Sequence, residues 1–263
     1  MVLNWLRSFA YSLTMVIVTP PYWMLALACF PLTHRVRYSV IRQWPRFFVW
    51  WLKVVCGVKY EIRGLENIPD TPTIVLSKHQ STWETFALTM LFRPQVWVLK
   101  KELLKVPFFG WGLAMLDPIA IDRSAGKTAM DQVFEQGAER LSRGCWVVIF
   151  PEGTRIPAGT RKRYKLGGAR LAVDAGVPVV PVAHNAGDFW PRRRFLKTPG
   201  TVTLSIGKPL SPEGLTPAEL MKQVEDWIED EVALLRAQNP ATAGEPKPLP
   251  DYSNGRASTS AKP

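Results

Sequence analysis

The pattern of apolar and polar residues changes near residue 59, which divides the chain into two unlike parts. Beyond that point short apolar runs, typical of buried strands, alternate with longer stretches of helical periodicity. The runs cover residues 73–77, 96–99, 118–121, 145–150, 177–182 and 201–206, and the helical stretches cover residues 82–92, 127–143, 164–175 and 217–237. Strands that alternate with helices build layered α/β domains. We therefore predict an α/β domain over residues 59–238, with a mixed sheet flanked by helices, and a disordered tail over residues 239–263.

The N-terminal part, residues 1–58, is predicted to be embedded in a membrane. Residues 9–32 carry no charge and are numerous enough to cross a bilayer. Pro20 and Pro21 interrupt this stretch, because proline lacks the N–H that a helix needs. A kinked spanning helix and a helical hairpin that enters one leaflet both remain open. The basic cluster at residues 34–37 places the following side in the cytoplasm by the positive-inside rule. Residues 38–58, aromatic and free of acids, indicate a helix in the interface, with a basic-capped core helix as the alternative.

The charge of the chain is concentrated in two segments. The formal net charge is +11, and residues 1–60 and 151–200 each carry a net charge of +7. Such an excess suits nucleic acid, an anionic membrane surface or a phosphorylated substrate. Five of the 11 tryptophans lie in the first sixty residues, and tryptophan mixed with basic residues is typical of a membrane interface. We expect membrane lipids as partners and no nucleic acid.

Cysteine and histidine offer neither a disulfide framework nor a metal site. The three cysteines are odd in number and contain no Cys-x-x-Cys pair, which indicates a reducing compartment. The three histidines lack the spacing of metal ligands. We therefore expect no metal.

The first segment that holds candidate catalytic residues is residues 77–84, directly after a predicted strand. His79 and Glu84 suit a base and the carboxylate that orients it. Five residues along a helix place two side chains roughly 140° apart, so the pair can meet only if His79 precedes the helix and Glu84 reaches back. A second interpretation is equally local. Ser81 and Glu84 match the capping-box pattern, in which the glutamate bonds the backbone of the helix start.

Three further segments follow in order. Residues 100–111 combine lysines with proline, glycine and aromatic residues and lead to Asp122 and Arg123. Residues 150–155 follow another predicted strand and end in Arg155, whose forked guanidinium suits a phosphate. Residues 177–182 form a proline-flanked apolar run that suits either an acyl-chain path or core packing.

Taken in this order, the four segments resemble the glycerolipid acyltransferase family over residues 73–182. The family's first segment usually ends in aspartate, whereas this chain has Glu84. One extra methylene still allows the same hydrogen bond. The N-terminal apolar part also suits this family, and the resemblance implies the bacterial inner membrane, with the active site on the cytoplasmic face.

What the resemblance implies is transfer of a fatty acyl group from an acyl thioester to the sn-2 hydroxyl of lysophosphatidic acid, giving phosphatidic acid in phospholipid biosynthesis. The donor would be acyl-CoA or acyl carrier protein, with no further cofactor. His79 would act as general base, and Glu84 would hold its imidazole. The acceptor phosphate would be held by Lys101, Arg123 and Arg155, and the substrate pocket would be shaped by Gly110, Glu152, Gly153 and Thr154.

Two alternatives remain. In the first alternative, the acceptor is glycerol 3-phosphate, a lyso-ornithine lipid or another lysophospholipid. The basic residues favour an acceptor with a phosphate. The other alternative is a non-enzymatic, basic protein that binds a membrane surface. That protein would explain the charge and the tryptophans but not the order of the four segments.

Overall fold

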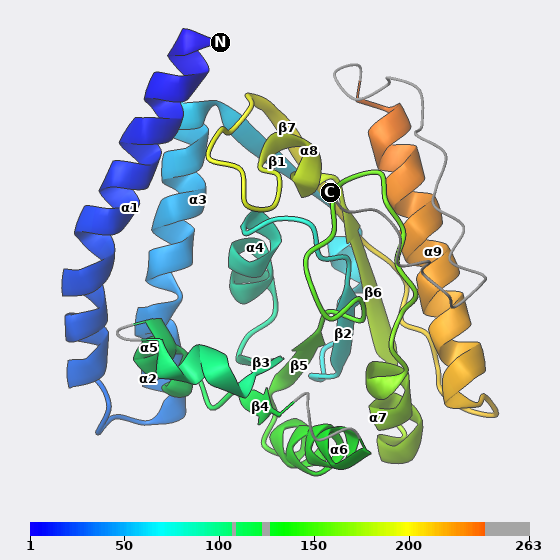
Figure 1. The fold of residues 1–263 in the computed structure, drawn as a ribbon. Helices are drawn as coiled ribbons and strands as arrows, with labels where there is room; N and C mark the ends of the chain where they lie inside the picture. Colours follow the sequence, from blue (N-terminus) through cyan, green and yellow to red (C-terminus); the bar gives the residue numbers. More distant parts are fainter. Residues whose placement is uncertain (107–108, 123–126, 240–263) are drawn as a thin grey trace, which may run out of the picture.

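The chain folds around one seven-stranded sheet in the order β1-β7-β6-β2-β5-β3-β4 (Figure 1). The computed structural model describes residues 1–106, 109–122 and 127–239. All strand pairs are parallel except β6 with β7, so the sheet is mixed, as predicted. The strands are β1 Val58–Arg63, β2 Ile74–Ser77, β3 Gln95–Lys100, β4 Ile119–Ile121, β5 Trp146–Ile149, β6 Val179–His184 and β7 Gly200–Ile206.

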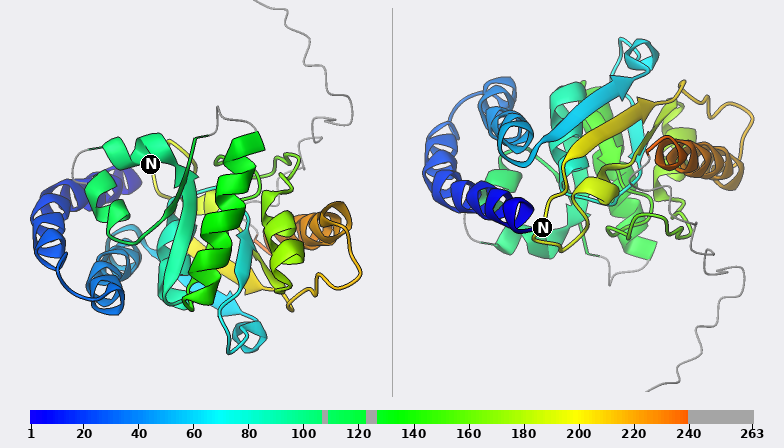
Figure 2. Two further views of the ribbon diagram at one scale, coloured as in Figure 1. Left: turned by 90° about the horizontal axis from the view of Figure 1, so that it is seen from below. Right: turned by 90° about the horizontal axis from the view of Figure 1, so that it is seen from above.

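Helices cover both faces of the sheet, as two views perpendicular to Figure 1 show (Figure 2). Alternate residues of a strand point to opposite faces, and Val75 belongs to one apolar cluster whereas Ile74 and Leu76 belong to the other. The first cluster packs against α3 and α4, and the second packs against α7 and α9. The helices of the domain are α4 Trp83–Leu91, α5 Phe109–Ala114, α6 Lys127–Ser142, α7 Gly167–Ala175, α8 Ala186–Phe189 and α9 Pro217–Ala237, with short 3-10 turns η1 Leu65–Asn67 and η2 Lys101–Lys105. The predicted α/β class is therefore confirmed.

The N-terminal part consists of α1 Val2–Ala28, α2 His34–Ile41 and α3 Gln43–Cys56. Of the two arrangements left open for α1, the structure has a single helix that continues through Pro20 and Pro21. Packing on both sides of the prolines holds the two halves together, because Tyr11 contacts Phe48 and Trp23 contacts Trp44 of α3.

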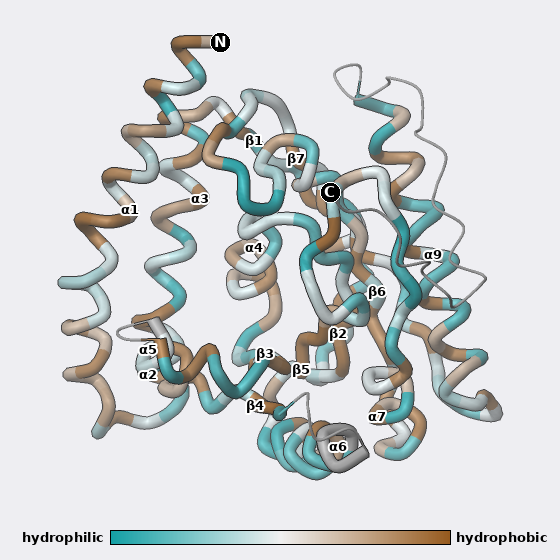
Figure 3. Tube along the Cα trace, viewed as in Figure 1, coloured by the Kyte–Doolittle hydropathy of each residue, from teal (hydrophilic) through white to brown (hydrophobic). Residues whose placement is uncertain are grey.

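Helix α1 is long and apolar enough to cross a membrane by length and composition. Brown and white residues dominate α1 in the hydropathy view (Figure 3). Most of its apolar side chains are exposed. This exposed apolar surface indicates membrane association. Residues 38–58, predicted as one interfacial helix, instead contain the break between α2 and α3 at Arg42. Helix α3 buries Phe48 and Leu52 in the core while exposing Trp50 and Val54, so its position in an interface stays a prediction.

The segment 1–58 shares a core with the sheet, since buried residues of α1 and α3 belong to the same apolar cluster as β2, β6 and β7.

The tail predicted from residue 239 lies, after Asn239, outside the described residues. At its start, α9 is held by a capping box in which Thr216 accepts from the Glu219 backbone and Glu219 accepts in return. This fixes the helix that runs along β6.

Candidate active site

Three segments that carry chemistry meet at the carboxyl ends of neighbouring parallel strands. Ser77 at the end of β2 pairs in register with Val182 of β6, and β5 lies on the other side of β2. His79 follows β2, residues 150–155 follow β5, and His184 ends β6. In α/β sheets this edge is where ligands bind. The topology therefore gathers side chains that are far apart in the sequence.

His79 and Glu84 form a hydrogen-bonded pair. The Nδ1 atom of His79 lies 2.9 Å from Oε1 of Glu84. His79 lies in the loop before α4 and Glu84 lies in its first turn, which is the arrangement that the spacing requires. Glu84 is fully buried and also accepts from the backbone N–H of Gln80 at 3.0 Å and of Ser81 at 2.9 Å. The orienting and capping interpretations of Glu84 therefore hold together.

These contacts determine the tautomer of His79. Burial alone raises the pKa of Glu84, but His184, the hydrogen bond and charge of His79, and Arg155 outweigh burial and hold the pKa below its ordinary value. An ionised carboxylate only accepts hydrogen bonds, so Nδ1 of His79 donates to Glu84. The lone pair of the neutral ring then lies on Nε2, the nitrogen that can take a proton.

The ring of His79 lines an apolar cavity of about 240 Å³. It stacks on Phe150, with ring centroids 3.7 Å apart, and Phe150 stacks in turn on Trp97. The remaining wall comes from several elements and includes Trp23, Trp44, Phe86 and Leu99. A proton-accepting group thus lies against a space suited to a hydrocarbon chain.

Arg155 lines the same cavity and supplies it with positive charge. Its Nε is buried and has no hydrogen-bond partner among the described residues. Burial lowers the pKa of Arg155, Glu84 raises it and Arg192 lowers it, yet a guanidinium keeps its proton in proteins. A buried donor without a partner points to a ligand that accepts from it.

The other residues predicted for the site are placed less uniformly. Gly153 lines the cavity with a φ of +71°, a left-handed conformation that favours glycine. Lys101 is exposed at the start of η2, while its neighbour Lys100 lines the cavity. Thr154 is half-buried and does not line the cavity. The predicted phosphate ligand Arg123 lies outside the described residues.

Gly110 and Glu152 have structural surroundings instead of a place in the cavity wall. A Cβ at Gly110 would lie 2.4 Å from the carbonyl oxygen of Leu104, so this glycine lets α5 pack closely on η2. Glu152 is fully buried, with its Oε1 3.1 Å from Nζ of Lys78. Neither residue is part of the described cavity wall, and a role of either in shaping the substrate pocket stays a prediction.

A second cavity of about 460 Å³ adjoins the first, because Phe150 and Gly153 line both. Arg163 and Lys165 line the second cavity, and no acidic residue is among its described lining residues. A Cβ on Gly153 would lie 3.3 Å from Nζ of Lys165, which places this ammonium at the boundary between the two cavities. The second cavity is thus positively charged where it meets the reaction site.

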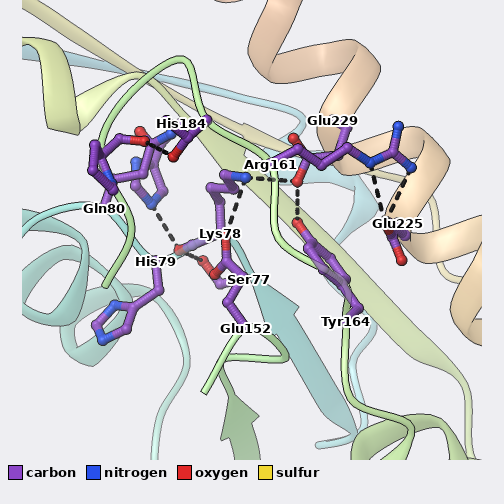
Figure 4. Close-up of polar contacts among 12 residues, drawn as sticks. Ser77, Lys78, His79, Gln80, Glu152, Arg161, Tyr164, His184, Glu225 and Glu229 are labelled. Atoms are coloured by element: carbon purple, nitrogen blue, oxygen red, sulfur yellow. Dashed lines mark hydrogen bonds and ion pairs between the residues drawn. The ribbon is translucent and has the colours of Figure 1, made fainter. Parts of the chain in front are cut away.

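His79 and Glu84 are called the dyad below. Sequence reasoning missed two groups next to this dyad, Lys78 and His184 (Figure 4). His184 is fully buried, 3.9 Å from Glu84, and its Nε2 lies 2.9 Å from the Lys78 carbonyl oxygen. The Nζ of Lys78 lies 2.6 Å from Oε1 of Glu229 in α9. Its partner Glu229 lies 151 positions further along the chain, so no local pattern signals this contact. Among the described residues, no group of three or more potential metal ligands is present.

Comparisons with known proteins agree with this site. A family model described as acyltransferase matches residues 59–185. The 1-acyl-sn-glycerol-3-phosphate acyltransferase of Pseudomonas aeruginosa is 53% identical over 77% of this chain and 80% of its own length. The protein of that name from Saccharomyces cerevisiae is 32% identical over 72% of this chain and 66% of its own length. The crystal structure of the 1-acyl-sn-glycerophosphate (LPA) acyltransferase PlsC from Thermotoga maritima is similar with a TM-score of 0.75 and 27% identity, covering 90% of this chain and 97% of that one.

A mixed α/β sheet that presents a histidine–carboxylate pair to an apolar cavity, together with these similarities, defines an acyltransferase. The chain belongs to the family of 1-acyl-sn-glycerol-3-phosphate acyltransferases, which are enzymes. The resemblance indicated by the four segments is thereby confirmed.

Proposed function

We propose that the chain transfers a fatty acyl group from an acyl thioester to the sn-2 hydroxyl of lysophosphatidic acid, giving phosphatidic acid. The observation that carries this proposal is the 2.9 Å contact between His79 and Glu84 at the wall of an apolar cavity that Arg155 also lines. The names of the relatives supply the acceptor, and acylation of its free hydroxyl gives the product.

The proposed mechanism is direct transfer with His79 as general base. Nε2 of His79 takes the proton of the acceptor hydroxyl while the oxygen attacks the thioester carbonyl. The tetrahedral intermediate collapses, the carbon–sulfur bond breaks, and the thiolate takes the proton from the imidazolium. Glu84 stabilises the positive charge that the ring carries in between. Ser81 is not needed as a nucleophile, and its hydroxyl donates to the Trp190 carbonyl at 2.7 Å.

We propose that Arg155 binds the acceptor phosphate. Arg155→Ala should raise the acceptor KM by about 10- to 100-fold, because a hydrogen bond to a charged group contributes about 1.5–3 kcal/mol. The measurement is phosphatidate formation in lipid vesicles over a range of lysophosphatidic acid concentrations. Arg194→Ala, an exposed arginine, is the control and should leave that KM unchanged. An unchanged acceptor KM in Arg155→Ala would remove Arg155 from the site.

The acceptor itself is tested by a panel. Purified protein should acylate lysophosphatidic acid faster than glycerol 3-phosphate, a lyso-ornithine lipid or another lysophospholipid. The Arg155→Ala effect should be lost with monoacylglycerol, which has no phosphate for the guanidinium to bind. Preference for a phosphate-free acceptor would contradict the proposed function.

The donor is proposed to enter through the second cavity, which adjoins the first cavity at Gly153 and is lined by Arg163 and Lys165. Acyl-CoA and acyl carrier protein share a phosphorylated pantetheine arm, and cations suit that phosphate. Arg163→Ala should therefore raise the KM of both donors and leave that of acyl-pantetheine, which lacks the phosphate, unchanged. Arg161→Ala is a matched control in the same loop, since Arg161 pairs with Glu225. A raised acceptor KM in Arg163→Ala would assign this cavity to the acceptor instead.

We propose that the protein acts at the bacterial inner membrane, with the site on the cytoplasmic face. Helix α1 supports this location by its exposed apolar length, and residues 34–37 support the orientation by their positive charge. Labelling of a single cysteine introduced beside these residues, in a variant whose native Cys29, Cys56 and Cys145 are replaced by serine, tests the orientation in sealed right-side-out vesicles. Labelling by an impermeant reagent before lysis would contradict it.

A further inference from the structure

The side chain immediately before the proposed base is a fully buried cation. Nζ of Lys78 lies 2.6 Å from Oε1 of Glu229 and 3.1 Å from Oε1 of Glu152, and the Lys78 and Glu152 side chains have no exposed surface (Figure 4). The hydroxyl of Tyr164 donates to the same Glu229 oxygen at 2.8 Å. An ammonium removed from water is tolerated only with partners of this kind. The two carboxyl groups therefore fix the position of the Lys78 ammonium.

The three charged groups come from three different parts of the fold. Lys78 follows β2, Glu152 lies in the turn after β5, and Glu229 lies on α9. Glu229 is outside residues 59–185, which the acyltransferase family model matches. One ammonium thus connects α9 to the loops after β2 and β5, which contribute His79, Gly153 and Arg155 to the cavity wall.

The backbone around Lys78 transmits this connection to the dyad. The N–H of Lys78 donates to the Val182 carbonyl at 3.0 Å, and its carbonyl accepts from Nε2 of His184. The carbonyl of His79 accepts from the N–H of Ile156 at 2.9 Å. Residue 78 is thus held at its N–H, its carbonyl and its ammonium, and the next residue is the base.

Of the two carboxyl partners of Lys78, Glu229 makes the shorter contact. Burial raises the pKa of Glu152, the charge and hydrogen bond of Lys78 oppose this, Glu229 raises it and the His79 backbone N–H lowers it, and together these effects bring the pKa to about 8. Tyr164, Arg161 and Glu225 are the other ionisable groups around Glu229.

We infer that Glu229 is a positioning residue for acyl transfer. It acts through Lys78 to hold His79 in a fixed position relative to the turn at Gly153. This inference rests on the proposed role of His79 as base. It assigns to α9 a part in the reaction although α9 does not line either cavity.

The test compares Glu229→Gln with Glu225→Gln in lipid vesicles. Glu225 lies one helical turn earlier on α9 and pairs with the partly exposed Arg161, so it is a matched control. Glu229→Gln should lower kcat by about 10- to 100-fold, as expected when a reacting group is displaced by roughly 1 Å, with both KM values within about twofold. Glu225→Gln should match the unmodified protein.

A conservative variant separates charge from shape. Glu229→Asp keeps the carboxylate but shortens the side chain, whereas Glu229→Gln keeps the shape and loses the charge. Positioning through Lys78 predicts that Asp retains more kcat than Gln, and a packing role predicts the reverse. If Glu229→Gln does not fold, Tyr164→Phe replaces it, because this change removes only the hydroxyl that donates to Glu229. That variant should lower kcat with an unchanged acceptor KM; because Tyr164 also lines the second cavity, the donor KM is not part of this test.

The outcomes distinguish this inference from the proposed function. Absence of phosphatidate formation by both the unmodified protein and Glu225→Gln would contradict the proposed function. Normal formation by those two, together with normal kcat in Glu229→Gln, would overturn the positioning role alone. In the Tyr164→Phe arm, an unchanged kcat would overturn it as well.

Discussion

Two histidines lie on either side of Glu84, and the structure uses them differently. His79 lies 2.9 Å from this carboxylate, keeps 14% of its side chain exposed and lines the apolar cavity. His184 lies 3.9 Å from it and is fully buried. The Nδ1 of His184 accepts from the Ala186 N–H at 3.2 Å, and its Nε2 donates to the Lys78 carbonyl. Proximity to a carboxylate is therefore not enough to make a base, because His184 has both nitrogens engaged by the backbone.

The electrostatics of the two positions follow from this difference. Burial lowers the pKa of His184, the negative charge of Glu84 and the Lys78 carbonyl raise it, and the nearby His79 and Lys78 lower it further. A neutral His184 supports the loop without adding a charge beside the dyad. His79 is the histidine that the cavity presents to a substrate.

Of the two histidine replacements, that of His79 is expected to lower kcat more. His79→Ala should lower kcat by about 10²–10⁴-fold, the usual contribution of general-base catalysis. Phosphatidate formation by purified protein in vesicles measures this loss. Vesicle binding should be unchanged, since α1 and not His79 supplies the exposed apolar surface. Turnover like that of the unmodified protein would exclude His79 as the base.

Much of this site could be predicted because its signals are local. The apolar runs predicted six of the strands, and the five-residue spacing of His79 and Glu84 fixed where each must lie relative to α4. Strand β1 was missed, although its apolar and charged residues alternate as in a half-buried strand, because it has no continuous apolar run and only Val58 is buried. An exposed edge strand lacks the continuous apolar run of a buried one.

The contacts that sequence reasoning could not find are those that depend on the folded topology. Lys78 and Glu229 are separated by 151 positions and meet only because α9 packs along β6. Glu152 was predicted in the pocket, but its side chain is buried against Lys78. Pro20 and Pro21 signal a break in α1, yet contacts of α1 with α3 on both sides keep the helix continuous.

Replacement of His184 is expected to have the smallest effect on catalysis and a clear effect on pH dependence. His184→Asn should lower kcat by less than about tenfold, which corresponds to about 1.4 kcal/mol. Since the native pKa is lowered, the unfolded chain binds a proton below about pH 6.5 that native His184 does not bind. The free energy of unfolding therefore falls as pH decreases from about 6.5 towards the lowered native pKa.

Denaturant unfolding of the unmodified and His184→Asn proteins, from about pH 7.5 to about pH 5, measures how the free energy of unfolding depends on pH. This range spans the ordinary histidine pKa. The His184→Asn protein should show a weaker decline than the unmodified protein. An equal decline in both would show that His184 does not titrate as its burial requires. A loss of kcat as large as that of His79→Ala would remove the distinction between the two histidines.

The most direct test of the central claim is a double-mutant cycle of His79→Ala and Glu84→Gln, read as kcat for phosphatidate formation. Because Glu84 is proposed to act on the reaction through His79, Glu84→Gln alone should lower kcat by about 10²-fold or more. The double variant should then be no slower than His79→Ala alone, since the carboxylate has no base left to orient. A double variant whose loss is the product of the two single losses would show that the residues act independently, and would contradict the account.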